Sequence, residues 1–266
     1  MAEERSCLSG DAIARHLKAG RIFILPFNSR NLGTSQYDLR LGSYYYRESL
    51  NGGESRIFNV YSKEDVDRVW GKTWYEAEQH TAWAKREHGG TLLTHIRPEE
   101  RIIVLEPGET ILAHTLEFIG GNDNRITTKM QARSSLGRSY TEVCKCAGMG
   151  DIGFCNRWTM EITNNSRSQR IPLIVGMRIA QLVFFETEGV AGATYRDAGK
   201  YQGGDTLADM VKSWHPEMMK PKLYNDWELR EGLGYRHFAE LHNTHIERFL
   251  KNGTMELENI TGEDYA

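Results

Sequence analysis

RITTKMQARSSLGRSYTEVCKCAGMGDIGFCNRWTMEITNN, Arg125 to Asn165, is the stretch of sequence that decides the fold class. It contains short segments in which apolar and polar residues alternate, and Gly, Asn or Ser separates most of them. Segments of the same kind, RIPLIVG and RIAQLVFFE, continue the pattern to Phe185. This spacing indicates an all-β barrel or sandwich rather than alternating β and α units.

The flanking sequence extends the pattern in both directions. Residues 9–19 have the apolar spacing of a short amphipathic helix, with Gly20 after it as a stop. RIFILPF and SQYDLRLGSYYY read as strands, and the second places Tyr37, Leu39 and Leu41 on one face. In RIIVLEPGETILAHTLEFI, the tetrapeptide EPGE predicts a hairpin turn between two strands.

Two regions have a different composition. Residues 62–90 are charged and rich in Trp, and they predict a helical insertion. Beyond residue 205, apolar residues recur at helical spacing and Pro216 and Pro221 interrupt them. We therefore expect a β domain over 1–204, interrupted by the insertion at about 62–90, and a helical extension over 205–266. For both regions we expect extra packing on the barrel.

Composition excludes several classes of function. The formal net charge of −3 over 266 residues gives no case for a nucleic-acid partner, and no apolar run is long enough to span a membrane. The charged N-terminus lacks the apolar core of a signal peptide, so we expect a cytoplasmic protein with reduced thiols. Cys144 and Cys146 would share one strand face as small hydrophobes, which we favour over a zinc site.

Chemistry-bearing residues gather in the same β region. The loop from Arg133 to Arg138 combines two arginines, two serines and exposed backbone N–H groups, a set suited to phosphate. Asp151 lies in a Gly-rich turn, and Glu161 alternates with Thr159 and Thr163 on one strand face. A carboxylate on an inward face must be paired or have a purpose. GKYQGG, residues 199–204, is expected to form a flexible lid over phosphates.

Five motifs, YDLRLG, ARSSLGR, DIGFCNRWTMEI, GMRIAQLVF and GKYQGG, together resemble the dCTP deaminase family of the dUTPase-like superfamily. The resemblance implies a mainly β, dUTPase-like distorted β-barrel with jelly-roll character. It also implies a homotrimer whose active sites lie between subunits. The implied reaction is hydrolytic deamination of dCTP to dUTP and ammonia without zinc, with Mg²⁺ carried by the triphosphate and not bound directly by the protein.

The resemblance also implies roles for individual residues. Glu161 would shuttle protons while water attacks C4 of the pyrimidine, and Ser134 and Arg138 would hold that water. The substrate would contact Arg133, Ser135, Ala147 (through its backbone carbonyl), Met149, Gln181, Lys200, Tyr201 and Gln202.

The sequence is also compatible with a second activity at the triphosphate. Met149, in AGMGDIG, replaces an arginine that simple deaminases often carry, and the stretch is nearer to that of bifunctional enzymes. Asp151 would then activate water to cleave the triphosphate, giving dUMP and pyrophosphate. A plain dUTPase and a nucleotide-sensing protein without turnover are further alternatives. Glu161 argues against the first, because that reaction needs no proton shuttle beside C4, and intact Ser134, Arg138 and Glu161 argue against the second. We expect dCTP as the substrate, ahead of dUTP, dCMP or a modified cytosine nucleotide.

Overall fold

The structure is a computed structural model, and it describes residues 7–49, 56–204, 206–232 and 246–253. Its elements are mostly strands, so the predicted mainly β class is confirmed. The strands are β1 (Ile22–Leu25), β2 (Tyr37–Arg47), β3 (Tyr75–Glu76), β4 (Glu78–Gln79), β5 (Arg101–Leu105), β6 (Thr110–Gly121), β7 (Ile126–Ala132), β8 (Thr141–Glu142), β9 (Met149–Gly150), β10 (Cys155–Asn164), β11 (Ile171–Ile174) and β12 (Arg178–Glu186).

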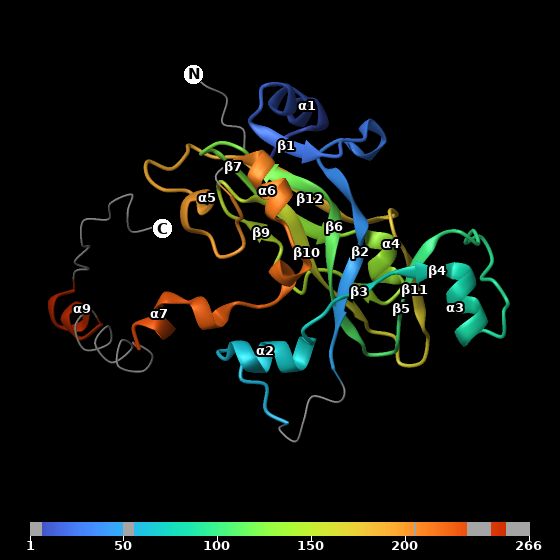
Figure 1. Cartoon of the computed structure of the whole chain (residues 1–266). Coiled ribbons are helices and arrows are strands. Elements are labelled where there is room, and N and C mark those ends of the chain that lie inside the picture. Colours follow the sequence, from blue (N-terminus) through green and yellow to red (C-terminus); the bar gives the residue numbers. More distant parts are fainter. Residues whose placement is uncertain (1–6, 50–55, 205, 233–245, 254–266) are drawn as a thin grey trace.

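Two sheets organise these strands. The larger has the order β8-β10-β6-β2-β12-β7-β9, with β1 also paired to β6 and β3 to β2. It curls around the core at the centre of the molecule (Figure 1). The smaller sheet has the order β11-β5-β4. The long central strands β6 and β2 therefore hold the structure together, and β10 lies beside β6 near one end of the large sheet.

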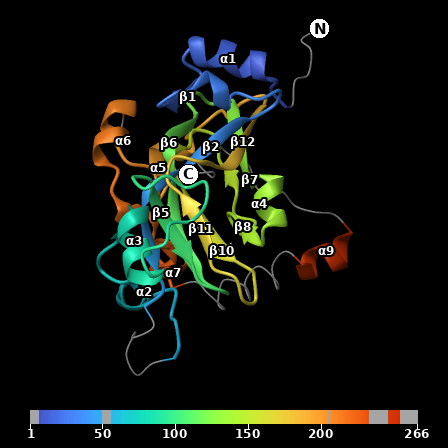
Figure 2. The same ribbon diagram turned by 90° about the vertical axis from the view of Figure 1, so that its right-hand side faces the viewer.

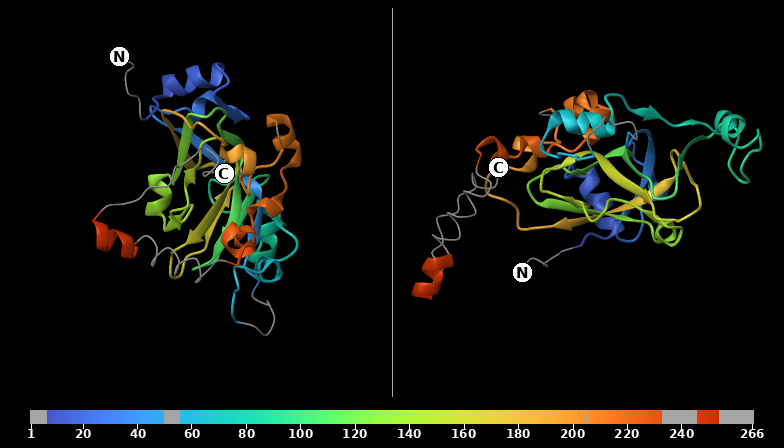
Figure 3. Two further views of the ribbon diagram at one scale, coloured as in Figure 1. Left: turned by 90° about the vertical axis from the view of Figure 1, so that its left-hand side faces the viewer. Right: turned by 90° about the horizontal axis from the view of Figure 1, so that it is seen from below.

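Helices surround the sheets. They are α1 (Gly10–Lys18), α2 (Lys63–Trp70), α3 (His80–Glu87), α4 (Ser134–Arg138), α5 (Tyr195–Ala198), α6 (Leu207–Ser213), α7 (Trp227–Arg230) and α9 (Glu247–Asn252), with 3-10 turns η1 (Ser29–Asn31), η2 (Pro216–Met219) and η3 (Leu223–Asn225). In Figures 2 and 3, α4 lies on one side of the main sheet and α2 and α6 lie on the other. No helix in the described ranges is long and apolar enough to cross a membrane. The division at residue 204 stays a prediction.

The alternation of β2 places its side chains as the sequence predicts. Tyr37, Leu39 and Leu41 are almost completely buried in the main core. On the other face Arg40 forms an ion pair with Glu117, at 2.5 Å. This pair explains how a fully buried carboxylate is tolerated, because Glu117 also accepts the backbone N–H of Arg40 at 3.0 Å. The polar face of YDLRLG is thus structural.

The EPGE hairpin prediction is wrong. The chain does turn there, with Gly108 at φ +76° and Glu109 N–H bonded to Glu106 O at 3.1 Å. However, β5 pairs with β11 and β4, whereas β6 pairs with β1, β2 and β10. The turn carries the chain from one sheet to the other, so its two flanking strands have different partners.

The strand predicted for TEVCKCA is also wrong beyond Glu142. Cys144, Lys145 and Cys146 have φ angles of 61°, 20° and 65°, which a strand cannot contain. Cys144 is buried and Cys146 exposed, so the two do not share a face. The predicted loop at 133–138 is a helical turn, α4. Together these two turns reverse the chain between β7 and β9, which pair with each other.

Candidate active site

A cavity of about 540 Å³ lies between strands β6 and β10 and a cover built from two distant parts of the chain. We call this cover the cap and define it as residues 58–70 and 214–221. The cavity is lined by Phe58, Val60, Trp70, Leu112, Ala147, Met149, Gly150, Asp151, Phe154, Asn156, Arg157, Trp158, Thr159, Glu161, Tyr195, Tyr201, Trp214, Met218, Met219 and Pro221.

Apolar packing fixes the cap to the sheet, and one ion pair joins the two halves of the cap. Met219 is buried against Tyr46 and Leu112, and Trp70 packs against the same cluster. Lys220 Nζ lies 2.7 Å from the Asp67 carboxylate, which joins the two halves of the cap. The insertion and the extension therefore do more than the packing expected of them: they form a wall of the cavity.

The side chains of β10 alternate between two faces of the strand, and one of these faces lines the cavity. Met160 and Ile162 are fully buried in the main core. The intervening residues Arg157, Thr159 and Glu161 are part-exposed and line the cavity. The predicted face of Glu161 and Thr159 is thus the cavity face, as period-two alternation requires.

Glu161 is a carboxylate held in an apolar environment. Its Oε2 atom is buried and has no hydrogen-bond partner among the described residues. Burial raises the pKa of Glu161 above its ordinary value, while the ammonium of Lys145 opposes the shift. A raised pKa makes the Glu161 carboxylate a stronger proton acceptor than an ordinary glutamate.

Asp151 reaches the same cavity from the turn after β9. Gly150 holds this turn close to the sheet, because a Cβ there would lie 2.3 Å from Thr128 Oγ1 and 2.4 Å from the Trp158 ring. The Asp151 side chain is exposed at the cavity wall, next to Met149, whose side chain is 63% exposed. Ala147, Met149 and Tyr201 also line the cavity, so together with Asp151 and Glu161 five predicted site residues meet there.

Helix α4 carries the other predicted catalytic residues, and it lies elsewhere. Ser134, Ser135 and Arg138 are exposed, and none of them lines the cavity. Arg133 also lies outside, with Nη1 donating to the carbonyl of Arg178 at 3.3 Å. The hydroxyl and guanidinium donors of α4 therefore face solvent. Within this single chain they lie away from the carboxylates of the cavity.

The predicted lid, residues 199–204, is docked over the cavity. Tyr201 lines it, and the Tyr201 carbonyl accepts from Asn156 Nδ2 at 2.8 Å. Gln202 Oε1 accepts the backbone N–H of Cys155 at 3.4 Å. Lys200 forms an ion pair with Asp226 of the extension. The lid is therefore tied both to β10 and to the C-terminal segment.

Gln181 is placed away from these groups. Its Nε2 donates to Asp38 at 3.0 Å, and Arg178 forms an ion pair with the same carboxylate at 2.8 Å. Gln181 does not line the cavity. Its predicted contact with substrate stays a prediction, whereas its bond to Asp38 links β12 to β2.

Sequence reasoning missed the aromatic residues of the cap and Arg157. The Trp-rich composition of the insertion and the motif SWHPEMM were the available signals. No cluster of three or more His, Cys, Asp or Glu side chains that could hold a metal occurs in the part of the chain that the structure describes. The zinc-free reaction stays a prediction.

Comparisons with known proteins match this region. The profile of the dCTP deaminase-like family matches residues 7–187. A protein of Methanopyrus kandleri named "dCTP deaminase, dUMP-forming" is 30% identical over 203 residues, covering 74% of this chain and 91% of that protein. A protein of Salinispora arenicola with the same name is 29% identical over 215 residues, covering 78% and 96%.

A solved structure is also similar. The 2′-deoxycytidine 5′-triphosphate deaminase of Agrobacterium tumefaciens aligns with 71% of this chain, at 18% identity and a TM-score of 0.47. This chain spans about half of that protein, 51% of its length. The family profile contains α4, β9 and β10, whereas residues 188–266, which supply half of the cap, lie beyond it.

Proposed function

This chain belongs to the dCTP deaminase-like family, and from that premise we propose that it is a bifunctional dCTP deaminase that forms dUMP. The relatives' names favour this alternative over the simple deaminase that the sequence analysis placed first. The observation that carries the proposal is the presence of two carboxylates, Glu161 and Asp151, in one cavity.

Deamination is assigned to Glu161. Its carboxylate takes a proton from a water molecule as the water oxygen attacks C4 of the cytosine ring, and it passes that proton to N3 of the ring. The carboxylate then takes the proton of the new C4 hydroxyl and gives it to the amine, so that the carbon–nitrogen bond breaks, ammonia leaves and C4 becomes a carbonyl. The raised pKa of Glu161 supports both transfers, because the ideal catalytic pKa lies near the working pH.

Triphosphate cleavage is assigned to Asp151. Its carboxylate activates a second water that attacks the α-phosphorus of dUTP; the bond to the bridging oxygen breaks and pyrophosphate leaves. The exposure of Asp151 supports this division of labour, because an exposed carboxylate is accessible to a water molecule and to the phosphate chain, whereas Oε2 of Glu161 is buried. The two environments suit two different proton acceptors.

A divalent cation coordinated by the phosphates of the substrate fits this site. Asp151 offers one carboxylate, and among the described lining residues Glu161 is the only other one. Mg²⁺ keeps phosphate oxygens and waters as most of its ligands, so the triphosphate can carry it without a direct protein ligand. Bound there, Mg²⁺ would neutralise part of the charge on the phosphate groups.

We further propose that a second subunit completes the site, within a homotrimer. Ser134 and Arg138 are exposed on α4, outside the cavity that contains Glu161. A neighbouring copy that docks its α4 at the mouth of the cavity would supply the hydroxyl and guanidinium that orient the attacking water. The separation of the two sets within one chain supports this arrangement.

The proposal is tested by incubating the purified protein with dCTP and Mg²⁺ and separating the products over time. We expect dUMP and pyrophosphate, with ammonia in equal amount to dUMP. Accumulation of dUTP would mean deamination alone, and conversion of added dUTP but not dCTP would mean a plain dUTPase. No change in dCTP, dUTP or dCMP would favour a nucleotide-sensing protein.

The division between the two carboxylates has its own test. Asp151→Asn is expected to convert dCTP to dUTP and to stop there, because the amide cannot accept the proton of the second water. Equal loss of both steps would remove the distinction between Asp151 and Glu161. Ammonia release, measured separately from pyrophosphate release, reads the two steps independently.

A further inference from the structure

Arg157 is held in an unusual environment on the cavity face of β10. Its guanidinium carbon lies 4.5 Å from the ring centroid of Trp214 and 4.7 Å from that of Phe118. Phe118 lies opposite Arg157 in the β10–β6 register, and Trp214 comes from the cap. Trp214 is itself fixed against His114, with ring centroids 4.6 Å apart. Contact with the two rings therefore restricts the guanidinium.

This guanidinium has no anionic partner among the described residues. No ion pair or side-chain hydrogen bond of the described chain involves it, and its buried Nε has no hydrogen-bond acceptor. Glu117, a carboxylate whose charge acts on it, is already bound to Arg40. Burial lowers the pKa of the Arg157 guanidinium, which shows the cost of an uncompensated charge.

Arg157 is also the only Lys or Arg among the described residues that line the cavity. It lies four residues before Glu161 on the same strand, a separation of about 13 Å along β10. An extended nucleoside triphosphate is longer than this distance. One nucleotide can therefore place its base at Glu161 and its phosphate chain at Arg157.

We propose that Arg157 is a substrate-binding residue that contacts phosphate oxygens of the nucleotide whose base lies at Glu161. The identity of that base rests on the proposed function; the affinity for phosphate does not. A planar guanidinium that contacts two rings presents its N–H groups to phosphate without a large loss of side-chain freedom. Lys200, predicted for the same task, already has a carboxylate partner in Asp226.

The cap acquires a role from this assignment. Trp214, which lies beyond the part matched by the family profile, orients the residue that binds phosphate. The C-terminal extension would thus take part in distinguishing a nucleoside triphosphate from a nucleoside. Arg157→Met keeps an unbranched apolar side chain at this position and removes the guanidinium with its charge and donors.

The test is calorimetric binding to the full-length protein. Inorganic tripolyphosphate is titrated into wild type and Arg157→Met, and dCTP and deoxycytidine are titrated into both in a Glu161→Gln background that blocks turnover. We expect Kd for tripolyphosphate and for dCTP to rise at least about tenfold in Arg157→Met, and Kd for deoxycytidine to change less than about twofold. Arg157→Lys should give an intermediate loss.

The matched control is Arg170→Met, which removes another arginine that lies over a tryptophan ring, at 5.9 Å from Trp83, far outside the cavity lining. Its Kd values should equal those of wild type. Equal tripolyphosphate affinity in wild type, Arg157→Met and Arg157→Lys, or no binding of tripolyphosphate to wild type, overturns the assignment. Because tripolyphosphate has no base, its result stands even for a protein that deaminates nothing.

Discussion

Helix α4 and the cavity face of β10 each present an arginine, and they do so in opposite ways. Arg138 on α4 is exposed, on the side of the sheet away from α2 and α6 (Figure 2). Arg157 on β10 is enclosed between Phe118 and Trp214. The Arg138 side chain is therefore accessible to another molecule, whereas contacts within its own chain orient the Arg157 side chain.

This difference supports the proposed division of the site between two subunits. A single chain supplies the carboxylates, the aromatic side chains and the cap that line the cavity beside β10. The exposed region has hydroxyl and guanidinium groups that do not line this cavity. We therefore expect substitutions in the cavity to act within the subunit that carries them, and substitutions in α4 to act on the site of a neighbour.

The largest expected effect is on catalysis, from Glu161→Gln. Removing the proton-transferring carboxylate of the described cavity lining should lower kcat for ammonia release by about 10²–10⁴-fold, the usual contribution of general acid–base catalysis. The control is Glu142→Gln on β8, outside the cavity lining, which should change kcat less than about twofold. A Glu161→Gln protein with normal ammonia release would contradict the assignment.

A smaller effect is expected from Lys220→Met, which breaks the ion pair between the two halves of the cap. The Lys220 side chain is 6% exposed, and it lies over the ring of Tyr46 at 5.0 Å as well as on Asp67. We expect the free energy of unfolding to fall by about 1–3 kcal/mol and KM for dCTP to rise, with kcat little changed.

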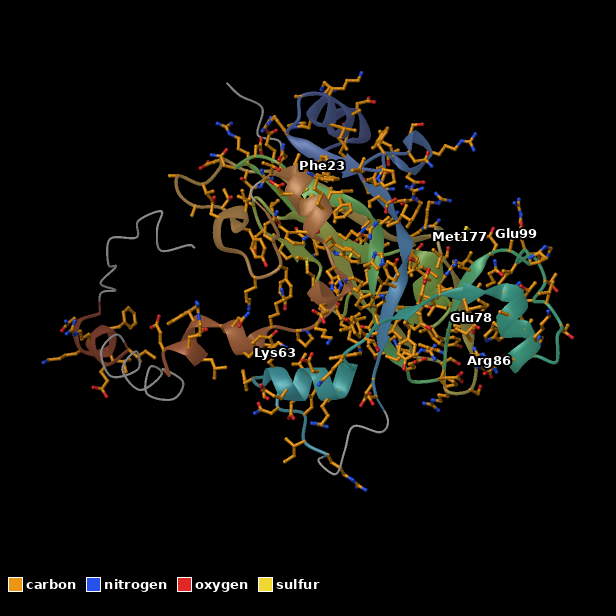
Figure 4. All side chains as sticks on the ribbon, in the orientation of Figure 1. Phe23, Lys63, Glu78, Arg86, Glu99 and Met177 are labelled. Atoms are coloured by element: carbon orange, nitrogen blue, oxygen red, sulfur yellow. The ribbon has the colours of Figure 1, made fainter. Side chains whose placement is uncertain are left out.

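Lys63→Met provides the comparison for that measurement. Lys63 binds the same carboxylate, at 2.8 Å, but its side chain is 62% exposed at the start of α2 (Figure 4). An exposed pair of this kind contributes little to stability. Equal urea midpoints for the Lys63 and Lys220 variants would show that the cap is not held by its buried lysine.

The smallest expected effect is on the pH dependence of stability. The pKa of Glu161 is raised by burial, so the folded state favours the protonated carboxyl. The wild-type protein should lose stability as pH rises through that raised pKa, while Glu161→Gln does not. Below the ordinary pKa of a glutamate, both states carry a neutral group and this difference disappears.

We therefore expect Glu161→Gln to be more stable than wild type at pH 8, with the difference shrinking toward pH 5. In a chain of this size each 1 kcal/mol corresponds to roughly 2–4 °C in Tm. Thermal unfolding of both proteins at several pH values provides the measurement. If the wild-type protein were the more stable of the two at pH 8, the claim that burial raises the pKa of Glu161 would be contradicted.

The sequence predicts those features of the site that follow from local patterns of residues. RWTMEITN alternates strictly, so the face of Glu161 follows from its spacing to Met160 and Ile162. The glycines around Asp151 likewise predict a tight turn. The curled sheet follows from many short alternating segments, although the change of sheet at EPGE does not, because a turn does not specify the partners of its strands.

The rest depends on contacts between residues far apart in the chain. The ion pair between Asp67 and Lys220, and the contact between Arg157 and Trp214, each join segments with no shared pattern. Trp-rich helical segments are equally compatible with plain packing. Only the fold brings the insertion and the extension over β10, so the cap could not be foreseen as a cavity wall.

The most direct test of the central claim, that α4 of one subunit serves the cavity of another, is a subunit-mixing experiment. Arg138→Ala and Glu161→Gln proteins, each inactive alone, are denatured together, refolded and assayed for ammonia release from dCTP. Mixed oligomers contain sites with an intact α4 from one chain and an intact Glu161 from the other, so activity should reappear. Mixed protein of normal oligomeric state that stays as inactive as its parents would contradict the account.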